Sequence, residues 1–189
     1  SSDLGFSALL TSGRLRDRGV ESIRIVERGA DVGGTWYWNR YPGIACDVVA
    51  YDYLPLLDET GYIPSRHYAG GEEIYQYCQL IARKYDLYDL AVFQTTVTST
   101  TWDEANKVWH VTTDRGDTMT AKFVICANGT LTKPKLARID GMERFKGHSF
   151  HTSRWDYEYT GSDLENTRNS PYSSKPGHEA QCSKGNLMH

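Results

Sequence analysis

The sequence predicts an α/β fold in which a parallel sheet carries helices on its faces and continues into a three-stranded antiparallel meander. A helical pattern near the N-terminus precedes a short alternating strand, and a strongly amphipathic segment follows in the middle of the chain. Three strand-like runs separated by turn residues come next. Helical and strand periodicities that alternate in this way are typical of α/β proteins.

The N-terminal segment is expected to form a helix and then a strand. Gly19 suits the C-terminal cap of this helix, and residues 22–27 alternate as a strand. The expected apolar face of the helix consists of Phe6, Leu9, Leu10 and Leu15.

A second helix is predicted from Glu72 to Lys84. Its apolar residues recur with the i, i+3, i+4, i+7 spacing of an amphipathic helix. Glu72 and Glu73 favour its start, because acidic groups stabilise the N-terminal end of the helix dipole. The apolar positions are Ile74, Tyr77, Cys78, Ile81 and Tyr85.

The meander is predicted from three runs, 92–102, 108–113 and 118–126, which the turn sequences EANK and DRGD separate. Residues 28–42 are dense in glycine and aromatic residues and show no period, so we expect a loop there. Loops of this composition tend to line functional sites. We expect residues 1–165 to form one partial domain. Residues 166–189 are rich in Ser, Pro, Gly and Lys and predict a disordered tail.

Composition narrows the class of protein. The chain has 189 residues and a net charge of −3, with Lys and Arg scattered among Asp and Glu, which argues against a nucleic-acid partner. The four cysteines show no C-x-x-C spacing, which argues against a zinc site and fits reduced thiols in a cytoplasmic protein. No apolar run reaches the roughly eighteen residues that span a bilayer, so stable membrane insertion is not expected.

A partial dinucleotide-binding pattern lies at the N-terminus. A Rossmann-type site needs a strand, a G-x-G-x-x-G turn and a helix, followed about twenty residues later by an acidic residue for the ribose. Aligning the helix leaves Asp3, Gly5 and Ala8 at the three glycine positions, and the first strand is absent. Glu27 falls at the ribose position, although a Glu at a strand end is more often a solvated charge.

The segment FKGHSFHTSRWD fits the pattern F-x-G-x-x-x-H-x-x-x-W-[P/D] through Phe145, Gly147, His151, Trp155 and Asp156. This pattern resembles the fingerprint of type I Baeyer-Villiger monooxygenases. The alternative is a surface turn with a stacked tryptophan. Because five fixed positions rarely coincide, we favour the family resemblance.

Residues 33–47, GGTWYWNRYPGIACD, are similar to the flavin-proximal segment of the same family. Gly33 and Gly34 would let the backbone pass close to a flat ring, and the aromatic side chains would exclude water from it. The alternative is that these aromatic residues fill a core. The expected aromatic wall consists of Trp36, Tyr37 and Trp38.

The resemblance also implies roles for single residues. Asp47 would anchor an active-site arginine, and the backbone of Val97 would meet the adenine. His151, in the linker between the flavin and nicotinamide domains, would orient those domains rather than transfer a proton. Asp47 and His151 are the catalytic candidates. The implied cofactor-binding positions are Gly5, Glu27, Thr35, Trp36, Tyr37, Trp38, Ala45, Cys46, Asp47, Tyr53 and Val97.

The resemblance implies a Rossmann-like FAD-binding domain of an enzyme that uses FAD and NADPH to insert oxygen next to the carbonyl of a small-molecule ketone. It covers residues 5–166 and is greatest to fungal members of secondary metabolism. No second G-x-G-x-x-[GA] follows Trp155, so the active-site arginine and the NADPH domain are not assigned to any residue. We therefore expect a fragment that by itself neither retains FAD tightly nor oxidises NADPH.

Two other functions remain open at this point. The chain would be a non-catalytic flavoprotein remnant or an interaction module if the missing strand and domain abolish cofactor binding. A flavin-containing N- or S-oxygenase is less favoured, because its fingerprint differs around Trp155. Flavin content after purification separates the first alternative from an enzyme.

Overall fold

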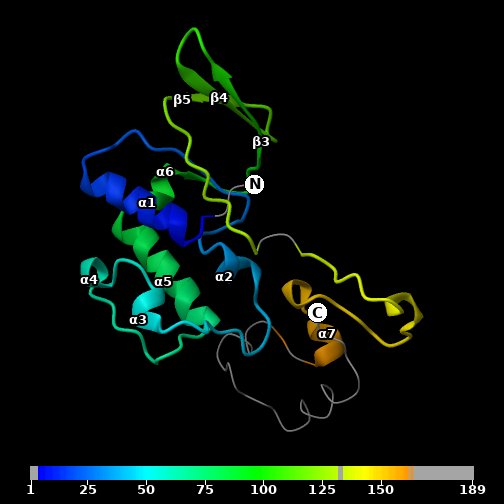
Figure 1. Cartoon of the computed structure of the whole chain (residues 1–189). Helices are drawn as coiled ribbons and strands as arrows, with labels where there is room; N and C mark the ends of the chain where they lie inside the picture. The colour runs from blue at the N-terminus through cyan, green and yellow to red at the C-terminus, as the bar shows by residue number, and fades with distance from the viewer. Residues whose placement is uncertain (1–3, 132–133, 162, 164–189) are drawn as a thin grey trace.

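A computed structural model describes residues 4–131, 134–161 and 163 of the chain. Its body contains two long helices, α1 (Phe6–Asp17) and α5 (Gly71–Lys84), beside a small parallel sheet. The meander projects from one end of this body (Figure 1). The segment that carries the fingerprint, residues 134–161, extends to the side and is called the linker below. The mixed α/β architecture confirms the predicted fold class. The expected tail at 166–189 lies outside the described residues.

Helix α1 ends as its sequence predicts. Gly19 has a φ of 75°, and its amide donates to the carbonyl of Arg16 at 2.9 Å. The amide of Val20 donates to the carbonyl of Leu15 at 3.0 Å, which completes a Schellman motif. Glycine is favoured here because it adopts the left-handed conformation without a Cβ clash.

The predicted apolar face of α1 is partly wrong. Leu9 is fully buried, but Leu10 is 37% exposed. The buried face continues instead through two small residues, Ser12 and Gly13. A Cβ at Gly13 would lie 3.2 Å from the ring of Tyr85, so a small residue is needed for α1 to approach the end of α5.

The parallel sheet is shorter than the sequence predicts. Strand β1 covers only Ile25–Val26 and pairs with β2, Ala91–Val92, so the strand expected over 22–27 is reduced to the part that has a partner. The strand expected over 92–102 is divided in two. Gln94, with a φ of 51°, interrupts the extended backbone after β2. The first part of that run therefore belongs to the parallel sheet.

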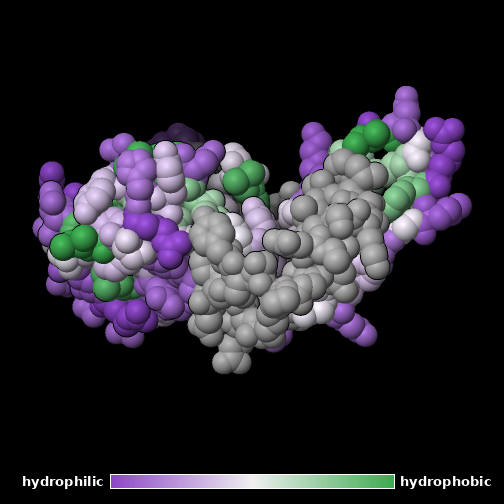
Figure 2. Space-filling view, turned by 90° about the horizontal axis from the view of Figure 1, so that it is seen from below, coloured by the Kyte–Doolittle hydropathy of each residue, from purple (hydrophilic) through white to green (hydrophobic). Residues whose placement is uncertain are grey.

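The amphipathic helix is confirmed as α5, which buries Ile74, Tyr77, Cys78 and Ile81 as expected. This face forms the centre of the hydrophobic core together with Leu9 of α1. Hydrophilic residues dominate the described surface in the space-filling view, and apolar residues form separate patches over the body and on the linker (Figure 2). Within the described residues, no helix is long and apolar enough to cross a membrane.

The meander contains β3 (Val97–Asp103), β4 (Val108–Thr113) and β5 (Thr118–Ala121). All its pairs are antiparallel, in the order β3-β4-β5. The prediction that the last strand reaches Cys126 is wrong. Ala121 already pairs with Trp109, one residue from the start of β4, so the partner strand ends there. The side chains of Phe123 and Ile125 beyond it are exposed.

Short helices make up most of the remaining regular structure. The loop expected over 28–42 contains one of them, α2, so Trp36, Tyr37 and Trp38 lie on a helical turn rather than in an irregular loop. The short helices are α2 (Thr35–Trp38), α3 (Ala50–Tyr53), α4 (Leu57–Thr60), α6 (Leu87–Leu90), η1 (Met142–Arg144), η2 (Thr152–Arg154) and α7 (Tyr157–Thr160).

Candidate functional site

The glycine pair before α2 packs directly against the N-terminus of α1. Gly34 has a φ of 52°, and a Cβ there would lie 2.7 Å from the Cα of Gly5. The amide of Gly33 donates to the carbonyl of Leu4 at 2.8 Å. A side chain at Gly34 would separate the two backbones, so this close approach requires glycine.

Glu27 follows β1 and is only 1% exposed. Its carboxylate accepts hydrogen bonds from the backbone amides of Leu4 and Gly29. The first of these amides immediately precedes Gly5, the N-cap of α1. The structure therefore places the acidic group beside the N-terminus of α1, and its contact with a ribose stays a prediction. A buried carboxylate also needs such donors to offset its lost hydration.

Trp36 points from α2 into the core. Its side chain is 8% exposed, and its indole N–H donates to the hydroxyl of Tyr53 at 2.9 Å. The two rings meet edge to face with centroids 5.9 Å apart. Burial raises the pKa of Tyr53. These two predicted flavin contacts are thus paired with each other in the core, and their cofactor roles stay predictions.

Tyr37 and Trp38 lie on another side of α2. Their rings meet edge to face with centroids 4.9 Å apart. The guanidinium of Arg40 lies 4.6 Å from the centre of the Tyr37 ring, and that of Arg28 lies 4.6 Å from the centre of the Trp38 ring. Both contacts have cation–π geometry, which attracts a positive charge to the ring face. The sequence interpretation missed both arginines. The only signals were that Arg40 stands beside Tyr41 and that Arg28 begins the loop rich in glycine and aromatic residues.

Asp31 fastens the loop before α2 to α5 and α6. Its carboxylate accepts hydrogen bonds from the hydroxyl of Tyr75 at 2.6 Å, from Nε2 of Gln79 at 2.8 Å and from the hydroxyl of Tyr88 at 2.9 Å. Burial alone would raise the pKa of Asp31, but these donors together hold it below its ordinary value. Burial and the hydrogen bond to Asp31 raise the pKa of Tyr75 to about 12. The ionised carboxylate of Asp31 therefore holds the loop before α2 against both α5 and α6.

The fingerprint forms a series of tight turns. His151 caps η2: its Nδ1 accepts from the backbone amide of Ser153 at 3.1 Å. The ring of Trp155 lies against Tyr41, with centroids 6.3 Å apart. His151 is thus engaged in local structure, and its expected roles in orienting the domains and in catalysis stay predictions.

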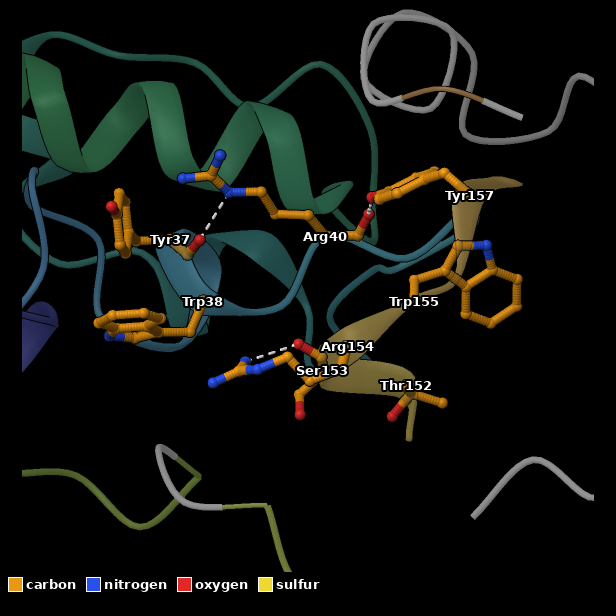
Figure 3. Close-up of a pocket in the computed structure, with 8 residues that line it drawn as sticks. All are labelled: Tyr37, Trp38, Arg40, Thr152, Ser153, Arg154, Trp155 and Tyr157. Atoms are coloured by element: carbon orange, nitrogen blue, oxygen red, sulfur yellow. Dashed lines mark hydrogen bonds between the residues drawn. The ribbon is translucent and has the colours of Figure 1, made fainter. Parts of the chain in front are cut away.

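A cavity of about 270 Å³ lies between α2 and the fingerprint linker (Figure 3). Of the predicted cofactor residues, Tyr37 and Trp38 line it, and Trp155 of the fingerprint is also part of its lining. Its described lining contains two guanidinium groups and no carboxylate, so it suits a ligand with aromatic and electron-rich or anionic parts. The lining residues are Tyr37, Trp38, Arg40, Thr152, Ser153, Arg154, Trp155 and Tyr157.

Several lining residues were not predicted individually. Thr152, Ser153 and Arg154 occupy the variable positions between His151 and Trp155 of the fingerprint, so the motif gave their location but not their role. The η2 turn brings all three to the cavity.

Other predicted positions lie away from this cavity. Asp47 is exposed, Cys46 is buried, and Ala45 forms a β-bridge with Gly70. Val97 begins β3 in the meander. The proposed contacts of these residues with a cofactor stay predictions. Among the residues that the structure describes, no group of three or more His, Cys, Asp or Glu side chains is placed to hold a metal ion.

Comparison with known families identifies the class of this protein. The family model described as pyridine nucleotide-disulphide oxidoreductase matches residues 11–163. This match covers most of the chain, and the chain belongs to that family.

Several similar proteins within this family are named as Baeyer-Villiger monooxygenases. Neopentalenolactone D synthase of Streptomyces avermitilis is 55% identical over 161 residues, which are 85% of this chain and 27% of that protein. A Baeyer-Villiger monooxygenase of Streptomyces coelicolor is 57% identical over 157 residues, 83% of this chain and 26% of that protein. One from the fungus Stachybotrys chlorohalonatus is 51% identical over 159 residues, 84% of this chain and 25% of that protein. The chain thus spans about a quarter of the length of these relatives.

Solved structures show the same similarity. The polycyclic ketone monooxygenase from the thermophilic fungus Thermothelomyces thermophila superposes with a TM-score of 0.75 at 38% identity, over 86% of this chain and 28% of that chain. The enzyme OTEMO, in complex with FAD and NADP, superposes with a TM-score of 0.71 at 33% identity, over 82% of this chain and 29% of that chain. The similarity to type I Baeyer-Villiger monooxygenases inferred from two motifs is thereby confirmed. The expectation of greatest similarity to fungal members is not met, because the two Streptomyces relatives are 55% and 57% identical to the chain and the Stachybotrys relative is 51% identical.

Proposed function

We propose that the chain forms part of a Baeyer-Villiger monooxygenase that uses FAD and NADPH to insert an oxygen atom next to the carbonyl of a small-molecule ketone. The observation that carries this proposal is the cavity in which α2 and the fingerprint linker meet, although they are far apart in sequence. Relatives at 55–57% identity named for this chemistry or for lactone-type synthases support it.

Glu27 is the residue we assign to the FAD ribose. Its carboxylate already faces the N-terminus of α1, and each carboxylate oxygen has lone pairs for more than one donor. A ribose hydroxyl would therefore join or replace the contact with Leu4. Gly5 and Gly34 have no side chains, so no Cβ at these positions would hinder a nucleotide that approaches the backbone here.

The cavity residues would enclose the reacting end of the cofactors. Tyr37 and Trp38 supply rigid aromatic surface that excludes water, and Arg40 and Arg154 supply positive charge. When bound, FAD would supply the oxygen-activating redox chemistry and NADPH the hydride. Asp47 and His151 stay the catalytic candidates by resemblance, Asp47 through the active-site arginine that it would anchor and His151 through the linker.

We also propose a role in secondary-metabolite biosynthesis and a cytoplasmic location. The first is supported by relatives named as pentalenolactone-type synthases. The second is supported by Cys46, Cys78 and Cys126, which are all free thiols in the structure, as is usual in a reducing compartment.

Titration with FAD, followed by quenching of flavin fluorescence, tests the cofactor assignment. Parent chain is expected to bind weakly and to lose FAD on gel filtration. The variant Glu27→Gln should bind at least about tenfold more weakly, because charge-assisted hydrogen bonds contribute roughly 1.5–3 kcal/mol. Glu21→Gln is the matched control, since Glu21 is an exposed residue of the same segment. Equal affinity of the Glu27 variant and the parent would contradict the assignment.

The reaction is tested on the complete gene product that contains this chain. Ketone-dependent NADPH consumption, with an ester or lactone detected by mass spectrometry, is the expected result. NADPH consumption that no ketone stimulates, with oxygenation of amines or sulfides instead, would favour an N- or S-oxygenase. A protein that binds no FAD under any condition would favour the non-catalytic alternative.

A further inference from the structure

The short helix α7 at the end of the fingerprint is braced on several sides. Its N-cap, Asp156, accepts a hydrogen bond from the amide of Tyr159 at 2.9 Å, and Nε2 of His148 lies 2.8 Å from the same carboxylate. The indole N–H of Trp155 donates to Oγ1 of Thr160 at 3.1 Å. A single helical turn is marginal by itself, so these contacts are what fix the direction of its side chains.

This braced turn directs Tyr157 at the loop after α2. The hydroxyl of Tyr157 donates to the carbonyl of Arg40, which is 117 residues away in sequence (Figure 3). A second contact lies close to this hydrogen bond in the chain: the ring of Trp155, two residues before Tyr157, lies against Tyr41, the residue after Arg40. A hydrogen bond and a ring contact therefore join the linker to the body at the edge of the cavity.

The receiving loop passes this contact on to α2. Nε of Arg40 donates to the carbonyl of Tyr37 at 2.6 Å, and its guanidinium lies over the rings of Tyr37 and Tyr75. The side chain of Arg40 thus binds α2 and lies over Tyr75 of α5. Its backbone carbonyl accepts the hydrogen bond from the hydroxyl of Tyr157. A shift of Tyr157 would move the backbone from which Tyr37 and Trp38 project into the cavity.

We infer that Tyr157 is a positioning residue, which holds the linker against α2 and so sets the width of the cavity between them. We call the hydrogen bond from Tyr157 to Arg40 the latch. Phenylalanine at this position would keep the ring and its packing but remove the latch. The consequence for cofactor access rests on the proposed function, whereas the latch itself does not.

Hydrogen exchange followed by mass spectrometry tests the latch directly on the full chain. In Tyr157→Phe, exchange in peptides over residues 36–44 and 155–161 should be about three- to tenfold faster, as expected for loss of one hydrogen bond. Peptides from α5 should not change, because global stability is retained. The control is Tyr51→Phe, since Tyr51 is 61% exposed and lies in α3. Unchanged exchange in residues 36–44 would overturn the inference, and so would equal acceleration of all peptides.

Iodide quenching of bound FAD tests the consequence for the cavity. At saturating FAD, the flavin in Tyr157→Phe should be quenched at least about twofold more strongly than in the parent and in Tyr51→Phe. Faster exchange without stronger quenching would overturn the positioning role. Absence of any FAD binding by the parent would overturn the proposed function and the positioning role together, while the exchange experiment would still decide whether the latch exists.

Discussion

Replacing Asp31 by alanine should destabilise the fold more than any exposed acidic substitution. The carboxylate accepts three side-chain hydrogen bonds of 2.6–2.9 Å, from Tyr75, Gln79 and Tyr88. Hydrogen bonds to a charged group contribute roughly 1.5–3 kcal/mol each. Asp31 is only half-buried, so hydrogen bonds from water would replace part of the lost stabilisation in the variant. Taking about 1 kcal/mol for each bond gives a loss of about 3 kcal/mol in the free energy of unfolding.

The assay is urea unfolding followed by circular dichroism, with the free energy taken from linear extrapolation. Asp89→Ala is the matched control, because Asp89 is an exposed residue of α6. It should change the free energy of unfolding by about 0.5 kcal/mol or less. Tyr88→Phe removes one donor and should cost about 1 kcal/mol. A loss below about 1 kcal/mol for Asp31→Ala would refute the view that this carboxylate anchors the loop before α2.

Two further predictions concern the same loop. Gly34→Ala should lower the free energy of unfolding by about 2–4 kcal/mol, because it combines a positive φ with a Cβ 2.7 Å from the Cα of Gly5. The control is Gly70→Ala, because a Cβ at Gly70 would meet no atom within 4 Å. Equal stability of the two variants would contradict the close approach of Gly34 to Gly5. Burial and Asp31 raise the pKa of Tyr75 to about 12, so its contribution to stability is complete below about pH 10 and is lost as pH rises toward 12. Urea midpoints measured from pH 9 to 11.5 should fall less steeply in Tyr75→Phe than in the parent, and parallel curves would exclude this linkage.

Local patterns predicted elements wherever periodic side chains coincide with burial. Helix α5 begins within a residue of its predicted start and ends where predicted, and β4 has its predicted bounds. The cap at Gly19 was also predictable, because its conformation depends on neighbouring residues alone. Prediction failed where a partner strand sets the length: β1 and β5 stop where β2 and β4 stop. Strand ends of this kind depend on residues far away in sequence.

The sequence alone determined which two segments matter, since the glycine and aromatic pattern of residues 33–47 and the fingerprint are both read from spacing. Only the tertiary structure decided which of their side chains meet. The turn of α2 sends Trp36 into the core and leaves Tyr37 and Trp38 at the cavity. The hydrogen bond from Tyr157 to Arg40 spans 117 residues, and no local pattern encodes it. Side-chain direction follows from how helices and turns pack against each other, which is a property of the whole fold.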